Sequence, residues 1–318
     1  MPDLGCSHGS REHVRWSVTL GEMTTPIKIL PNKAASYPAS VPDHSQPLIE
    51  HRPESLLLTL LGIHLREPGR AVYSGSVIEI LERVAISEEA TRSTVSRMAR
   101  RGLLHRVRTG RRSHLEPTDR LRVVLEDGHR RIWELRAVNR SWDGSWTLVG
   151  FSLPDTWRRQ RHDLRSRLIW ARFGMVQPGL WVAPGLVDVA AVAAGLDLDD
   201  YLTVTHGRAV PPTEAADLAR RGFDLTSVAA EYKQFLERWE HARNLPGGDA
   251  LTRELLLHTE WLQLIRADPR LPAELLPTDW PAIEAERLFH RVARRLSPDA
   301  ARQAAVELHV IATPTAVR

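Results

Sequence analysis

The stretch from residue 87 to residue 114, SEEATRSTVSRMARRGLLHRVRTGRRSH, constrains the fold more than any other part of the chain. Ser87 suits a helix N-cap, because its hydroxyl can accept from a free backbone N–H of the first turn. Gly102 suits the position after the last turn, where a left-handed backbone favours glycine. Two basic strands around a glycine turn follow. The stretch therefore predicts a helix followed at once by a hairpin, as in a winged helix-turn-helix.

The helical pattern separates buried positions from exposed ones. Thr91, Val95 and Met98 recur at i, i+4 and i+7 and predict the buried stripe. A helix of this kind fits the major groove of DNA, where arginine side chains reach guanine edges or phosphates. A solvated basic helix without a partner is the alternative, and the hairpin that follows weighs against it. The helix positions predicted to contact DNA are Arg92, Ser93, Ser96, Arg97 and Arg100.

The hairpin, with its turn predicted at Thr109 and Gly110, is also strongly basic. Between Ser87 and Arg122 the chain has ten arginines and four acidic residues, whereas its overall net charge is only +4. Such a cluster attracts a polyanion and releases its counterions on binding. Charge that protects an edge hairpin from aggregation is the alternative, and we favour nucleic acid. The hairpin positions predicted to contact DNA are Arg108, Arg111, Arg112 and His114.

The upstream chain supplies the rest of a winged unit. The apolar run at 55–62 and the stretch 76–84 predict two helices, and residues 121–138 predict a long, highly charged connector helix. Residues 54–138 are therefore predicted to form a DNA-binding domain. Residues 1–53 contain scattered Pro, Ser and His with no sustained period, so we expect a disordered tail.

Six stretches of the chain are specific when taken together. They are SLLLTLLG (55–62), SGSVIEIL (74–81), RSTVSRMARRGLL (92–104), RTGRRSHLEPT (108–118), WDGSWTLV (142–149) and DPRLPAELLPTDWP (268–281). With these stretches the chain resembles the PaaX family of bacterial transcriptional repressors, which is named for control of phenylacetic acid catabolism. The chain departs from the family at His114, where a Tyr is usual, and at Thr91 and Val95, where larger aliphatic residues are usual. The resemblance implies a homodimer that binds a double-stranded DNA operator and represses a catabolic operon. It also implies release from DNA by an aryl acyl-CoA such as phenylacetyl-CoA.

Residues 139–215 read as a small domain of alternating strands and helices. The order is βαββαβ-like and fits a ferredoxin-like unit. Strand patterns lie at 146–153, 174–182 and 201–205, and helical patterns lie at 155–172 and 187–194.

In the resembled family this middle region is similar to a dimeric CRISPR spacer-acquisition nuclease, so a metal-dependent nuclease is the alternative function. That enzyme group places an Asp at the end of its first strand. Here the position falls near Phe151 and Ser152, and Asp155 has no second carboxylate to pair with it. We therefore expect dimerisation and ligand sensing, and no metal site.

Residues 216–318 predict a C-terminal helical effector domain. Because CoA is polyanionic, a site for it should contain arginines. His258 lies in an apolar helical pattern, which favours a core residue over a ligand contact. The candidate effector-binding residues are Arg158, Arg161, Arg165, Arg167, Arg253 and Arg266.

The overall prediction is an α+β protein that is not an enzyme. No nucleophile elbow, Walker loop, dinucleotide glycine pattern or zinc spacing is present, so we expect no cofactor. Cys6 is the only cysteine, which excludes a disulfide framework. The chain has no membrane-spanning apolar run or signal-peptide pattern, so a cytoplasmic protein without a membrane partner is expected. A partner-binding adaptor is a third possibility, and the density of arginine in the hairpin weighs against it.

Overall fold

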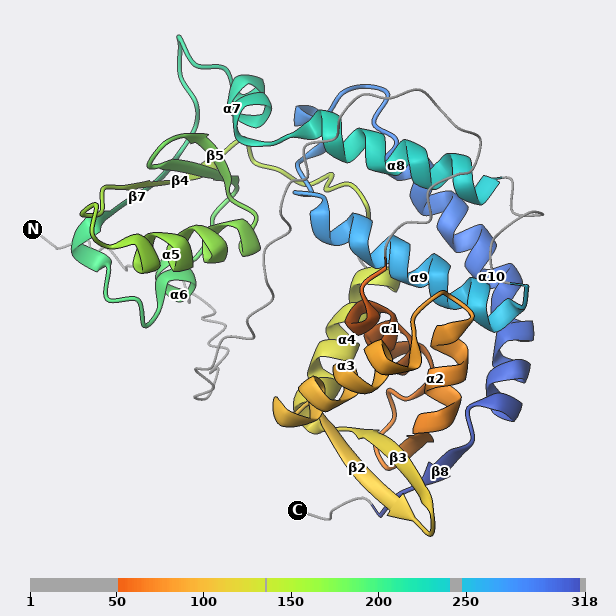
Figure 1. The fold of residues 1–318 in the computed structure, drawn as a ribbon. Coiled ribbons are helices and arrows are strands. Elements are labelled where there is room, and N and C mark those ends of the chain that lie inside the picture. Colours follow the sequence, from red (N-terminus) through yellow and green to blue (C-terminus); the bar gives the residue numbers. More distant parts are fainter. Residues whose placement is uncertain (1–50, 135, 241–247, 315–318) are drawn as a thin grey trace, which may run out of the picture. The chain divides into compact units, whose positions relative to one another are not determined.

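The computed structural model describes residues 51–314, apart from residue 135 and residues 241–247 (Figure 1). Helices and two small antiparallel sheets make up these residues, so the predicted α+β class is confirmed. The tail predicted at residues 1–53 lies almost wholly outside the described residues. Within the described part of the chain, no helix combines the length and the hydropathy that crossing a membrane requires.

Three helices open the described chain: α1 (Pro53–His64), α2 (Ser74–Glu82) and α3 (Glu88–Arg100). Helix α1 contributes four fully buried leucines to the core, which explains why its sequence is too apolar for an exposed helix. Helix α3 begins as predicted, because the Ser87 hydroxyl accepts from the Ala90 N–H at 3.2 Å. The chain leaves α3 through Gly102, whose φ of 67° is in the left-handed region.

The first sheet has the strand order β2-β3-β1-β8 (Figure 1). Strands β2 (Leu104–Thr109) and β3 (Arg112–Pro117) form the predicted hairpin, with the two turn residues at Gly110 and Arg111. Two further strands complete the sheet: β1 (Arg70–Tyr73) pairs with β3, and β8 (Val310–Ala312) pairs with the other edge of β1. The C-terminal end of the described chain is therefore a structural part of the hairpin sheet.

Helix α4 (Asp119–Trp133) follows the hairpin. It begins where the Thr118 hydroxyl accepts from the Leu121 N–H, and it ends before the predicted limit of residue 138. Ala137 and Val138, which were predicted to be helical, lie beyond α4 and are buried in the hydrophobic core.

The central segment folds in the predicted order of strands and helices. Its sheet has the order β5-β6-β4-β7, and every neighbouring pair is antiparallel. Leu164 and Leu168 of the first helix pack with Val149 and Trp181 of the sheet. The elements are β4 (Trp146–Phe151), α5 (Arg158–Trp170), β5 (Gly174–Gln177), β6 (Leu180–Pro184), α6 (Val189–Ala193) and β7 (Leu202–Gly207).

Four helices follow: α7 (Ala215–Gly222), α8 (Leu225–Glu240), α9 (Ala250–Ala267) and α10 (Ala282–Glu307). Helix α7 packs on the central sheet, where Leu218 meets Trp146 and Val182. Helix α9 is buried along most of its length and packs against α1, α4, α8 and α10. The N-terminal helices and the C-terminal helices thus share one hydrophobic core.

Candidate functional site

Helix α3 presents a polar, arginine-rich face to solvent. The predicted buried stripe is confirmed, since Thr91, Val95 and Met98 are 1%, 6% and 0% exposed. The five helix positions predicted to contact DNA are, in contrast, all exposed to solvent. Exposed positions of α3 include Arg92, Ser93, Ser96, Arg97 and Arg100.

Among the described residues, the hydrogen bonds of the two arginines near the centre of α3 go to side chains of the same helix. Arg97 donates to the Ser93 hydroxyl at 2.7 Å and to the Thr94 hydroxyl at 2.8 Å. Arg92 donates to Glu88 at 2.7 Å, one turn earlier. The contact between Arg92 and Glu88 joins two exposed side chains and is worth little in water, so it can be exchanged for a contact with an anionic partner.

The C-terminal end of α3 is held firmly. Arg101 forms an ion pair with Glu54 at 2.8 Å, which ties the end of α3 to the start of α1. The Thr118 hydroxyl donates to the Gly102 carbonyl at 2.9 Å and fixes the turn into the hairpin. The exposed face of α3 is therefore carried on a rigid element.

The hairpin carries a second group of exposed arginines. Gly110 has a φ of 61° at the first turn position, as a type II′ turn requires. The guanidinium carbon of Arg112 lies 5.1 Å from the centre of the Tyr73 ring, within cation–π range. Exposed arginines of the hairpin are Arg106, Arg108, Arg111 and Arg112.

His114 differs from the other predicted DNA contacts, because it is only 3% exposed. The pairing of β1 with β3 sets Tyr73 opposite His114, and the two rings lie 5.8 Å apart. No local sequence pattern marks strand β1, so the burial of His114 beside Tyr73 was not predicted.

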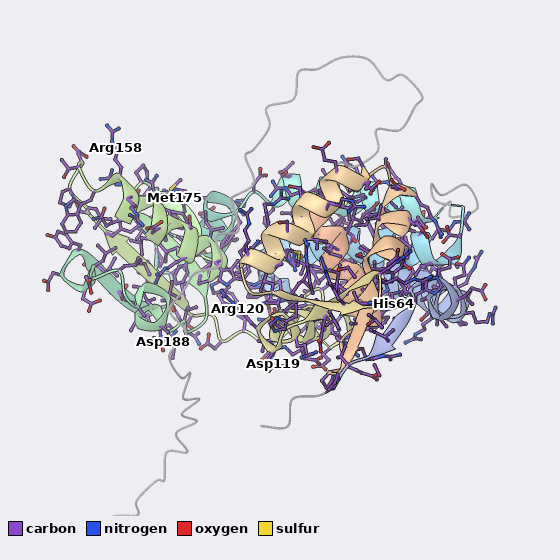
Figure 2. All side chains as sticks on the ribbon, turned by 60° about the horizontal axis from the view of Figure 1, so that its bottom comes forward. His64, Asp119, Arg120, Arg158, Met175 and Asp188 are labelled. Atoms are coloured by element: carbon purple, nitrogen blue, oxygen red, sulfur yellow. The ribbon has the colours of Figure 1, made fainter. Side chains whose placement is uncertain are left out.

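The predicted effector-binding arginines fall into separate places. Arg161 donates to the Leu153 carbonyl at 2.8 Å, and Arg167 donates to the Ala194 carbonyl at 2.6 Å, so both fix the backbone. Arg158 and Arg165 are exposed on α5, and Arg158 extends outward in Figure 2. The other two, Arg253 and Arg266, belong to α9.

Arg266 lines a cavity of about 260 Å³ between α1, α4, α9 and α10. The wall is largely apolar, with Leu58, Val124 and Leu262 among its residues. Trp133, at the end of α4, also lines it, and the Trp133 ring lies 5.8 Å from the His258 ring. The cavity therefore draws on helices that are far apart in the sequence.

Two buried polar residues of α9, Glu254 and His258, also line this cavity. Among the described residues, neither Glu254 Oε2 nor His258 Nδ1 has a hydrogen-bond partner. Burial raises the pKa of Glu254 to about 7, although a hydrogen bond with Ser297 opposes the rise. Burial lowers the pKa of His258 to about 3, so its ring is neutral at neutral pH.

His64 lies beside this polar pair, with its Nε2 atom 3.8 Å from Glu254 Oε2. Burial lowers the pKa of His64 to about 4. His64 is therefore uncharged at neutral pH, and its contact with Glu254 is not an ion pair. Glu254 and His258 thus give the cavity wall two buried polar groups with unused hydrogen-bonding capacity, whereas Arg66, Arg266 and Arg294 line it as charged groups.

No sequence pattern marks this cavity, because its wall comes from helices far apart in the chain. His258 was expected to be a core residue, and it is indeed 4% exposed, but its unpartnered nitrogen carries no sequence signal. The described residues hold no group of three or more His, Cys, Asp or Glu side chains arranged to bind a metal ion.

Known proteins match nearly the whole described chain. The model described as PaaX-like protein matches residues 52–121, the PaaX protein central Cas2-like domain matches residues 139–219, and the PaaX-like protein C-terminal domain matches residues 223–306. The transcriptional repressor PaaX of Escherichia coli is 28% identical over 259 residues, which are 77% of this chain and 81% of the relative. An uncharacterized protein from Mycobacterium tuberculosis has a similar solved structure, with a TM-score of 0.54 and 26% identity over 79% of this chain and 97% of its own. With three models of one family matching successive parts of the sequence, this chain belongs to the PaaX-like family.

Proposed function

We propose that this protein is a transcriptional repressor that binds double-stranded DNA through α3 and the β2–β3 hairpin. The observation that carries the proposal is the exposed arginine surface of these two neighbouring elements, which have few partners beyond their own helix or strand. The similarity to a protein named as a transcriptional repressor supports it.

In this proposal the helix–hairpin unit works as a winged helix-turn-helix. Arg92, Ser93, Ser96, Arg97 and Arg100 face the major groove, where arginine can bind guanine with two hydrogen bonds. Arg108, Arg111 and Arg112 bind phosphates and supply affinity that does not depend on sequence. His114 is left out of the contact set, because its ring is buried beside Tyr73.

The proposal extends to a homodimer on a two-fold symmetric operator, with residues 139–215 as a ferredoxin-like dimerisation domain. The antiparallel order β5-β6-β4-β7 supports that fold, since a split βαββαβ unit has this arrangement. An aryl acyl-CoA such as phenylacetyl-CoA is the proposed effector, on the family resemblance. The effector must bind the DNA-free form better than the DNA-bound form, because equal affinity would shift nothing.

No observation favours the nuclease alternative. Strand β4 ends at Phe151, and the described residues hold no group of three or more His, Cys, Asp or Glu side chains that could bind a metal ion.

Footprinting on the DNA that flanks the protein's own gene tests the proposal. We expect a protected site with two half-sites, bound by a dimer in light scattering and released by phenylacetyl-CoA. Equal binding to random DNA and to the flanking region would contradict a repressor. Release by an unrelated metabolite, with no response to the acyl-CoA, would contradict only the effector.

A further inference from the structure

We propose that the cavity between α1, α4, α9 and α10 is the effector site of this protein. Its ligand would be an amphipathic compound, with an apolar ring or chain and one uncharged polar group inside and an anionic part at the mouth. The inference rests on the proposed function, since it assigns a place and a chemical class to the regulation of the repressor.

The size and the wall of the cavity fit a compact apolar group. An apolar protein cavity of about 150 Å³ is large enough to bind benzene. The volume of about 260 Å³ here accommodates a substituted ring, and it is too small for a nucleotide. Leu58, Val124, Ile132 and Leu262 line it and would replace water around such a group.

The polar part of the wall fits one uncharged polar group of the ligand. Glu254 and His258 are 3% and 4% exposed, and each has a side-chain atom without a partner among the described residues. A buried polar atom left unpaired destabilises the folded protein. A ligand carbonyl can accept from protonated Glu254 or from the His258 ring and remove that cost. Because burial disfavours the charged form of both residues, the pair suits a neutral group rather than an ion.

The charge at the mouth fits an anion. Arg66, Arg266 and Arg294 line the cavity and also reach solvent. Of these, Arg66 is paired with Glu126 at 3.3 Å. The excess positive charge beside an apolar cavity favours a carboxylate or a phosphate at the mouth. A free aryl carboxylate and an aryl thioester of CoA both have this chemistry.

Occupancy of the cavity would reach the DNA-binding surface through the helices that form its wall. Helix α1 lines the cavity, and its Glu54 holds Arg101 at the end of α3. Helix α10 also lines it and leads into β8, which pairs with β1 in the hairpin sheet. A ligand that moves α1 or α10 against α9 therefore biases the position of α3 and of the hairpin.

Gly128 offers a matched pair of variants. It lines the cavity within α4, and a Cβ added there would meet no atom within 4 Å. Gly128→Leu should fill the space, while Gly128→Ala gains the same helix propensity and leaves the space nearly empty. Calorimetric titration of each purified full-length variant with phenylacetate, phenylacetyl-CoA and CoA alone measures the effect. We expect Gly128→Leu to lose at least tenfold in affinity for the ring-containing probe that binds, and Gly128→Ala to stay within about twofold of wild type.

A second pair tests the mouth and does not depend on packing. Arg294→Gln should weaken binding of the anionic probe about tenfold, whereas Arg295→Gln, an exposed neighbour on α10 outside the cavity wall, should not change it. Binding of phenylacetate alone identifies a free acid, and binding of only the thioester identifies the CoA form. Equal affinity of Gly128→Leu and Gly128→Ala, or binding of CoA alone as tightly as its thioester, would overturn the proposal, as would no binding of any probe to wild type.

DNA binding is measured in parallel, so that the two proposals fail separately. Loss of ligand response in Gly128→Leu with normal DNA affinity supports the cavity. Ligand binding by a protein that ignores DNA would refute the repressor and leave the cavity site standing.

Discussion

Helices α3 and α5 look alike in the sequence, since each is short and rich in arginine, yet the structure uses their arginines differently. On α3, Arg92 and Arg97 contact only side chains one turn away on the same helix. On α5, Arg161 and Arg167 donate to backbone carbonyls of loops that lie outside the helix. Whether an arginine is available to a ligand therefore depends on what its side chain already contacts, and not on how many arginines surround it in the sequence.

The largest effect on DNA affinity is expected from the hairpin arginines. Replacing Arg111 and Arg112 together by Ala should weaken binding to every DNA sequence by about 3 kcal/mol, or roughly 100-fold, through loss of two charge-assisted contacts. The salt dependence of log K should flatten by about 0.9 for each lost phosphate contact. Fluorescence anisotropy over a salt series measures both.

The matched control removes the same charge from α5. Arg158→Ala with Arg165→Ala takes away two exposed arginines, and DNA affinity and salt slope should stay as in wild type. The same control variant should keep its response to an effector, because neither residue lines the cavity. An equal loss of DNA binding in the two double variants would mean that only net charge matters.

The next test concerns Arg97 on α3. Arg97→Ala should cost about 1–3 kcal/mol on the operator and relax the sequence preference at one base pair, if the guanidinium binds guanine through two hydrogen bonds. Arg97→Lys keeps the charge and loses the fork of donors, so it should retain most of the affinity for random DNA. Uniform weakening on operator and random DNA would assign Arg97 to a phosphate instead.

The features that could be predicted from the sequence are those that depend on residues close together along the chain. The cap at Ser87, the buried stripe beginning at Thr91 and the hairpin are local signals, and the structure confirms them, although the turn lies at Gly110 and Arg111, one residue later than predicted. Strand β8 and its pairing with β1 depend on residues at opposite ends of the described chain, so no local pattern marks them. The burial of His114 and the shape of the cavity follow from such distant contacts and were missed for the same reason.

Glu254, a buried acid of α9, is another side chain whose surroundings determine its behaviour. Burial raises the pKa of Glu254 to about 7, so the folded protein holds this proton to higher pH than the unfolded chain does. The contribution of Glu254 to the free energy of unfolding should therefore fall as pH rises from about 4.5 to about 7. A glutamine at this position does not ionise. The free energy of unfolding of Glu254→Gln, relative to wild type, should therefore rise by about 2 kcal/mol between pH 5 and pH 8.

Urea unfolding of both proteins at the two pH values measures this difference. His64 and His258 have lowered pKa values and occur in both proteins, so their contribution cancels. A stability difference that does not change with pH would mean that Glu254 is ionised in the folded state.

The smallest effect is expected at Arg167 of α5, and it concerns the free energy of unfolding rather than DNA binding. Arg167→Ala removes donation to the carbonyl of Val192, in the last turn of α6, and to that of Ala194, just beyond the helix. We expect a loss of about 1 kcal/mol in the free energy of unfolding, because these contacts are partly exposed and water can replace the donor. Arg165→Ala, which removes an exposed arginine from the same helix, should change stability by less than about 0.5 kcal/mol. Neither variant should alter DNA affinity.

If Arg167→Ala instead kept full stability and weakened effector binding, the arginine would be a ligand contact, and the contrast between α5 and α3 would fail.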